Sequence, residues 1–127
     1  MRIIVIDDDQ SIGEIMRRIL APLHNDVTIV HTAPALCAVA HDAATAHIPF
    51  DLLITDVDIE DSGIVTDGID QADTILHVHK DVFRSVLVMS GDDSNRNRAH
   101  EKGWPFLKKP FDRAELTAAI EMATKQS

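Results

Sequence analysis

The sequence has 127 residues and lacks several features, and each absence excludes a class of protein. It has a single cysteine, Cys37, so an internal disulfide and a zinc site built from several cysteines are excluded. No apolar run approaches the ~18 residues of a membrane span, and the run after Met1 is too short for a signal peptide. We therefore expect a protein of the reducing cytoplasm that does not insert into a membrane.

Basic residues are also scarce, with 12 Lys and Arg against 21 Asp and Glu and a formal net charge of −9. This balance argues against nucleic acid or an anionic membrane as the main partner. Of the acids, 16 are Asp and 5 are Glu. Because Asp favours turns, helix caps and metal sites, we expect the acids to gather where strands and helices end. The length and the 45% of hydrophobic residues predict one folded domain over residues 1–127.

Short apolar runs predict strands that are covered on both faces, since they are rich in β-branched residues or leucine and do not alternate with polar residues. Four runs are clear and the fifth is weaker: 3–6, 27–30, 52–55, 86–89 and 106–107.

Helical spacing of apolar residues occurs between these runs. The expected helices are 12–21, ended by Pro22, then 35–46, 68–80, 94–102, and one that begins after Asp112 with a capping box to Glu115. The helix over 94–102 has Ala99 as its only apolar residue, so we expect it to be weakly held. This alternation predicts a doubly wound α/β domain. From the flavodoxin-like class of such domains we take a parallel five-stranded sheet in the order 2-1-3-4-5.

Acidic and other polar residues follow four of the predicted strands. Neighbouring strands lie about 4.8 Å apart, so the side chains of Asp8 and Asp56 could reach one ion. Each pair of carboxylates ~5 Å apart costs roughly 3 kcal/mol at an effective dielectric constant of ~20, and a hard cation such as Mg²⁺ offsets that cost. A single Asp is better explained as a helix cap, which is our prediction for Asp9. The residues at strand ends are Asp7, Asp8 and Asp9, then Asp56 and Asp58, then Ser90, Asp92 and Asp93, then Lys108 and Lys109.

Several of these residues, taken in order, resemble the signature of response regulator receiver domains. The matching motifs are Asp7-Asp8, Asp56, Ser90 and Lys109-Pro110. The segment 103–111 is similar to the Phe-Leu-x-Lys-Pro-Phe ending of that family. The resemblance spans the whole chain, with one motif at the end of each of four strands.

The resemblance implies a phosphoacceptor in bacterial two-component or phosphorelay signalling. Asp56 would accept a phosphoryl group from a phosphohistidine on a sensor histidine kinase or phosphotransfer protein. Asp8 would bind Mg²⁺ (or Mn²⁺) directly, Asp7 would bind it through water, and the backbone carbonyl of Asp58 would add a ligand. Such a domain catalyses only its own phosphorylation and dephosphorylation, so it is a switch rather than a turnover enzyme.

The resemblance also implies the residues that sense the phosphoryl group. Lys109 would pair with phosphoryl oxygens, and the Ser90 hydroxyl would bond one of them after phosphorylation. Phe106 would follow Ser90 inward as the switch aromatic, although an aromatic residue on a strand is more often plain core. The Lys109–Pro110 bond is cis in many relatives. A downstream protein would bind the face formed by the fourth helix, fifth strand and last helix.

The sequence departs from the family pattern after the third strand. The family usually has Pro at the position of Glu60, and the Gly expected about eight residues after Asp56 comes later, as Gly68. We therefore expect a loop over 57–66 about four residues longer than usual, with a turn at Ser62 and Gly63. Asp58 and Asp92 occupy positions that vary in receivers, and we hypothesise that they tune the hydrolysis of the phosphoryl group.

Two other functions fit parts of the sequence. The motif at Asp56-Val57-Asp58 also resembles the nucleophile motif of haloacid-dehalogenase-type phosphatases, which use Asp and Mg²⁺. The order of the motifs and Glu60 disfavour that interpretation, because position 60 should be Thr or Val. A receiver-like module that binds partners without phosphorylation is the third interpretation. The basic side chains of 94–102 are either a solvated face or, with Trp104 and the last helix, an output surface.

Overall fold

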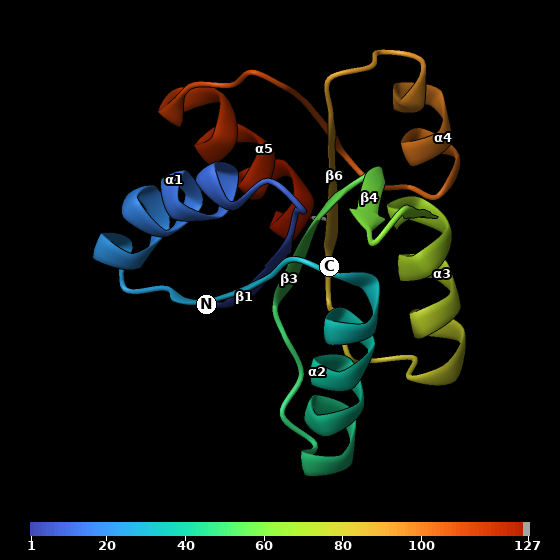
Figure 1. Cartoon of the computed structure of the whole chain (residues 1–127). Coiled ribbons are helices and arrows are strands. Elements are labelled where there is room, and N and C mark those ends of the chain that lie inside the picture. The colour runs from blue at the N-terminus through green and yellow to red at the C-terminus, as the bar shows by residue number, and fades with distance from the viewer. Residues whose placement is uncertain (126–127) are drawn as a thin grey trace.

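Five parallel strands form the central sheet of the computed structural model, which describes residues 1–125 (Figure 1). Their order is β2-β1-β3-β6-β7, which confirms the predicted order once the two strands of a separate hairpin, β4 and β5, are set aside. The predicted domain end at residue 127 lies outside the described residues. The strands are β1 (Arg2–Ile6), β2 (Asp26–Val30), β3 (Leu52–Asp56), β4 (Asp58–Asp61), β5 (Ile64–Asp67), β6 (Val86–Ser90) and β7 (Phe106–Lys108).

Helices cover both faces of this sheet (Figure 1). They are α1 (Gln10–Leu20), followed by the short 3₁₀ turn Ala21–Leu23, then α2 (Ala33–Ala46), α3 (Gly68–Val78), α4 (Asn95–Glu101) and α5 (Arg113–Lys125). Pro22 lies in the 3₁₀ turn, as expected for a residue that cannot continue a helix. Among residues 1–125, none of these helices is long and apolar enough to span a membrane.

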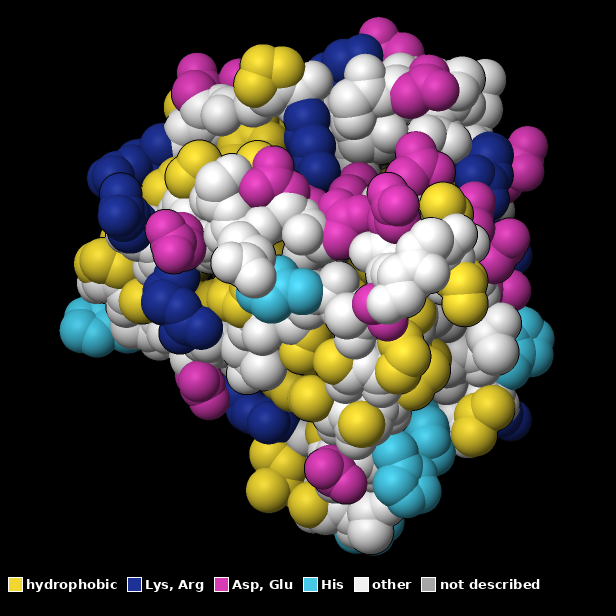
Figure 2. Space-filling model, in the orientation of Figure 1, with side chains coloured by type: hydrophobic (Ala, Val, Ile, Leu, Met, Phe, Trp, Pro, Cys, Tyr) yellow, Lys and Arg dark blue, Asp and Glu magenta, His cyan; other side chains and the backbone are white. Residues whose placement is uncertain are grey.

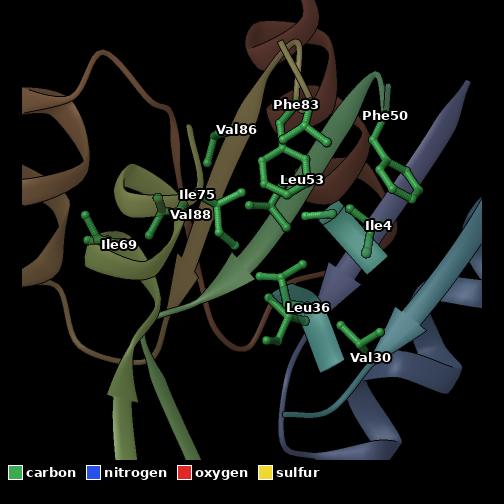
Figure 3. Close-up of a cluster of buried hydrophobic side chains, with 14 of the residues drawn as sticks. Ile4, Val30, Leu36, Phe50, Leu53, Ile69, Ile75, Phe83, Val86 and Val88 are labelled. Atoms are coloured by element: carbon green, nitrogen blue, oxygen red, sulfur yellow. The ribbon is translucent and has the colours of Figure 1, made fainter. Parts of the chain in front are cut away.

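Alternate residues of β1 point to two separate hydrophobic cores, one on each face of the sheet. Ile4 and Ile6 pack in the core beneath α2 and α3, part of which Figure 3 shows. Ile3 and Val5 pack in the core beneath α1 and α5. All four side chains are fully buried. The continuous apolar runs of the sequence are thus explained by burial on both faces.

Polar caps fix where the helices begin at the carboxyl edge of the sheet. Asp9 caps α1, as predicted, since its carboxylate accepts the N–H of Ser11. Asp67 caps α3 in the same way. Asp112 and Glu115 exchange the two reciprocal hydrogen bonds of a capping box at the start of α5. These caps hold the helix N-termini next to the strand ends that carry the polar residues.

The segment predicted as a long loop is a β-hairpin instead. Strands β4 and β5 pair antiparallel around a two-residue turn in which Ser62 and Gly63 both have positive φ, 54° and 83°. Such turns match the twist of paired strands. Ile59 on β4 is 1% exposed and anchors the hairpin in the core, whereas Ile64 at the start of β5 is 70% exposed. The predicted turn was correct, but the flanking residues pair as strands.

A lone cysteine within an apolar helical stretch is expected to pack in that helix's buried face, and this expectation is wrong for Cys37. It lies on an exposed face of α2 rather than in its packed face, and its Sγ accepts a weak hydrogen bond from Gln71 Nε2 at 3.4 Å. The apolar face of α2 is made by Leu36, Ala40 and Ala43.

Candidate functional site

Three carboxylates meet at the carboxyl edge of the sheet. Asp7 and Asp8 follow β1, and Asp56 ends β3, the neighbouring strand. One oxygen from each carboxylate lies within 4.8 Å of the others. Asp7 is 0% and Asp56 8% exposed, and Asp8 is the most exposed of the three. The structure therefore brings together side chains that the sequence placed at two separate strand ends, and Figure 2 shows acidic side chains gathered beside the hairpin.

Lys109 crosses from the end of β7 to this cluster. Its Nζ lies 2.6 Å from Asp7 Oδ2 and 3.3 Å from Asp56 Oδ2. Burial lowers the pKa of Lys109, but the hydrogen bond to Asp7 and the charge of Asp56 outweigh it, so the pKa is raised overall. Lys108, one residue earlier, points elsewhere and pairs with Asp93 at 3.3 Å. The peptide bond between Lys109 and Pro110 is cis, as in many members of the resembled family.

Hydrogen bonds from Val57 and Thr55, and the close approach of Gly68, fix the position of Asp56. The N–H of Val57 donates to Asp56 Oδ1 at 2.9 Å, and Thr55 Oγ1 donates to the Asp56 carbonyl at 2.9 Å. A Cβ at Gly68 would lie 1.8 Å from that carbonyl oxygen, so only glycine fits there. The hairpin leaves the sheet after Asp56 and returns the chain to Gly68, which explains why the glycine comes late in the sequence.

The surroundings of Asp56 favour the protonated form of its carboxyl group more strongly than bulk water would. Burial, and next the negative charge of Asp7, raise the pKa of Asp56 to about 6, while the nearby Lys109 acts in the opposite direction. A group with this pKa is about nine-tenths ionised at pH 7. The carboxylate is therefore available as a nucleophile near neutral pH.

Ser90 ends β6 beside the cluster and is 3% exposed. Its Oγ accepts the N–H of Asp92 at 3.0 Å and the side-chain amide of Asn95 at 3.1 Å. The hydroxyl serves as acceptor in both contacts, so neither uses its proton. Asn95 was missed by sequence reasoning; the available signal was its position four residues before Ala99, on the only face of α4 that could be buried.

Asp58 and Asp92 lie at the rim of the site with exposed side chains. Asp92 Oδ1 accepts the N–H of Ser94 at 2.9 Å, and this contact lowers the pKa of Asp92. Asp92 therefore shapes the turn that leads into α4. Asp58 begins β4 opposite Asp67. Its side chain is exposed.

Charged contacts attach α4 to α3 and β7. Arg98 pairs with Asp67 at 2.8 Å and with Asp70 at 3.6 Å, and Lys102 pairs with Asp73 at 3.2 Å. On the other side, the guanidinium of Arg96 lies 4.7 Å from the ring centroid of Phe106, which is half-buried on β7. The basic side chains of α4 thus take part in specific contacts, which the interpretation as a purely solvated face did not anticipate.

The donor set fits a hard divalent cation. Carboxylate oxygens are the ligands that Mg²⁺ prefers, and Mn²⁺ accepts the same set. When ionised, the three carboxylates carry three negative charges and Lys109 one positive charge, which leaves two charges to be balanced. A site for Mg²⁺ or Mn²⁺ is therefore consistent with the chemistry of the residues present.

Comparisons with known proteins identify the family of this chain. The model of the response regulator receiver domain family matches residues 3–121. The chain is 32% identical over 124 residues to the DNA-binding transcriptional regulator NtrC of Azospirillum brasilense, covering 95% of this chain and 24% of that protein. It thus spans about a quarter of the length of that relative.

Solved structures share the fold. A receiver domain from Clostridium thermocellum superposes with a TM-score of 0.79 at 23% identity, covering 98% of this chain and 94% of that one. The non-phosphorylated HemR receiver domain of Leptospira biflexa superposes with a TM-score of 0.68 at 27% identity, covering 94% and 90%. Because the family match extends over nearly the whole chain and the strand order agrees with it, this chain belongs to the response regulator receiver domain family.

Proposed function

We propose that the chain is the phosphoacceptor of a bacterial two-component or phosphorelay system. Asp56 takes a phosphoryl group from a phosphohistidine on a sensor histidine kinase or phosphotransfer protein, and the acyl phosphate then alters a partner-binding surface. The observation that carries this proposal is Lys109, whose Nζ bridges Asp7 and Asp56 within a cluster of three converging carboxylates. Family membership favours this function over the phosphatase interpretation.

The transfer step is a substitution at phosphorus. An oxygen of Asp56 forms the new P–O bond as the P–N bond of the donor breaks, and the electron pair of that bond stays on the imidazole nitrogen. Lys109 donates to a phosphoryl oxygen as negative charge accumulates there. Asp7, Asp8, Asp56 and the backbone carbonyl of Asp58 would hold Mg²⁺ or Mn²⁺, which would neutralise charge on the phosphoryl oxygens.

The switch begins at Ser90. Since its hydroxyl is the acceptor in both bonds described above, its proton can be donated to a phosphoryl oxygen. Turning toward that oxygen draws Ser90 away from Asn95, the buried residue at the start of α4. Phe106 follows Ser90 and changes its contact with Arg96. The downstream partner binds the face formed by α4, β7 and α5, and the domain acts as a switch rather than as a turnover enzyme.

Asp58 and Asp92 are proposed to set the lifetime of the acyl phosphate, because both are exposed and lie two residues after Asp56 and Ser90. We expect Asp58→Asn and Asp92→Asn to change the rate at which phosphorylated protein loses phosphate. The decay can be followed by intact mass after removal of the donor. Unchanged decay in both variants would show that neither carboxylate acts on the attacking water.

The phosphoacceptor role is tested by incubating the protein with Mg²⁺ and a small acyl-phosphate donor and then measuring intact mass. We expect the wild type to gain one phosphoryl group and Asp56→Asn to gain none. An unmodified wild type would leave the phosphorylation-independent binding module as the better interpretation. Steady release of phosphate from phosphomonoesters would instead favour the phosphatase.

A further inference from the structure

The hairpin reaches back to the cation site through one backbone hydrogen bond. The N–H of Glu60, on β4, donates to Asp8 Oδ2 at 2.7 Å. The two residues are 52 positions apart in the chain, and β4 is the element that replaces the expected loop. The other oxygen of Asp8 remains available to a cation.

The register of the hairpin determines which backbone groups face the site. Gly68 N–H donates to the Val57 carbonyl at 2.7 Å, and Glu60 stands opposite Val65. Because backbone groups alternate in direction along an antiparallel strand, Val57 and Ile59 point toward β5, and Asp58 and Glu60 point away from it. The carbonyl of Asp58 therefore lies on the same strand edge as the Glu60 N–H that bonds Asp8.

We infer that the main-chain N–H of Glu60 is a positioning group that holds Asp8 ready for the cation, an inference that rests on the proposed function. Asp8 is the most exposed of the three carboxylates and is repelled by Asp7 and Asp56. Without a tether, its side chain would relieve that repulsion by turning into solvent. The hydrogen bond to Oδ2 keeps it in the cluster, so less rotamer freedom is lost when a cation binds.

This role requires only that residue 60 has a main-chain N–H. The family usually has proline there, and proline has no N–H to donate. Any other residue supplies the same donor, so the side chain of Glu60 is not the active feature. The hairpin thus replaces the usual loop with a strand whose exposed edge donates a backbone N–H to the cation ligand Asp8.

The test compares three variants by calorimetric titration with Mg²⁺ alone. Glu60→Pro removes the N–H, and we expect its dissociation constant for Mg²⁺ to rise on the order of 10-fold, as is typical when the hydrogen-bond partner of a metal ligand is lost. Glu60→Gln keeps the N–H and should stay within about twofold of the wild type. Val65→Pro is the matched control, since it places proline directly opposite, where the N–H also points away from the partner strand.

A second measurement reports the hydrogen bond without any metal. In Asp8→Ala, amide hydrogen exchange at Glu60 should become faster, while exchange at Val65 stays unchanged. Equal Mg²⁺ affinity in wild type and Glu60→Pro, or equal weakening in Val65→Pro, would overturn this inference and leave the proposed function intact. A wild type that does not bind Mg²⁺ would overturn the cation site itself, and with it both proposals.

Discussion

Two groups of ion pairs in this molecule have similar distances but different surroundings. At the carboxyl edge, Lys109 lies 2.6 Å from Asp7, whose side chain is 0% exposed. Between α3 and α4, Arg98 lies 2.8 Å from Asp67, with side chains 39% and 32% exposed. Coulomb interactions at equal distance are several times stronger where water is excluded. Burial, rather than the number of charges, therefore distinguishes the ion pairs of the site from the exposed ion pairs that attach α4 to α3.

The largest effect expected from this comparison is on stability when the buried pair is broken. Lys109→Met leaves the carboxylate of Asp7 buried without its cation, which should lower the free energy of unfolding by about 3 kcal/mol at pH 7 in EDTA. The neighbouring change Lys108→Met removes only an exposed pair with Asp93 and should cost at most about 0.5 kcal/mol. Urea unfolding of both variants measures the difference, and equal losses would contradict the distinction by burial.

A smaller effect concerns the pH dependence of stability. Because the pKa of Asp56 is raised to about 6, the folded protein binds more protons than the unfolded chain between about pH 4 and pH 6. The contribution of Asp56 to the free energy of unfolding is therefore most favourable below pH 4 and is lost as the pH rises through 6. After allowance for solvent screening, this loss is roughly 1 to 2 kcal/mol.

The variant Asp56→Asn isolates that contribution, since an amide does not titrate in this range. In EDTA, the stability difference between the variant and the wild type should grow in favour of the variant from pH 4 to pH 7. Parallel pH profiles for the two proteins would show that the surroundings of Asp56 do not raise its pKa.

The smallest effect is expected for the exposed ion pairs between α4 and the start of α3. Arg98→Ala removes the contacts with Asp67 and Asp70 and should lower the free energy of unfolding by less than about 1 kcal/mol. High salt should reduce this difference further, because the screening length falls to about 3 Å at 1 M. A loss that is as large as for Lys109→Met, or that is insensitive to salt, would place this pair in the same class as the buried one.

Much of the sheet could be predicted because its strands are buried on both faces and so are continuous apolar runs. The residues 3–6 and 86–89 carry this signal without interruption. The hairpin shows a weaker signal in the sequence. Its strands have four residues each and contain several acids, and they are stabilised by contacts from elsewhere, such as the burial of Ile59 and the bond to Asp8.

The site could be predicted as residue types but not as a set of contacts. Chain order and strand order placed Asp7, Asp8 and Asp56 at one edge, because parallel strands end together. That Lys109 rather than Lys108 reaches the cluster was suggested only by the proline that follows it. The position of Asn95 four residues before Ala99 indicates burial but not the bond to Ser90. The backbone N–H of Glu60 that bonds Asp8 leaves no pattern in the sequence.

We propose that Asp56 and Lys109 act together, with a divalent cation, in phosphoryl transfer. The most direct test is the initial rate at which a small acyl-phosphate donor phosphorylates wild type, Lys109→Met and Lys108→Met, each with Mg²⁺ and with EDTA. We expect fast phosphorylation only with Mg²⁺, a loss of about 100-fold or more in Lys109→Met, and wild-type behaviour in Lys108→Met. Phosphorylation of Lys109→Met at the wild-type rate, or of the wild type in EDTA at the rate seen with Mg²⁺, would contradict the claim.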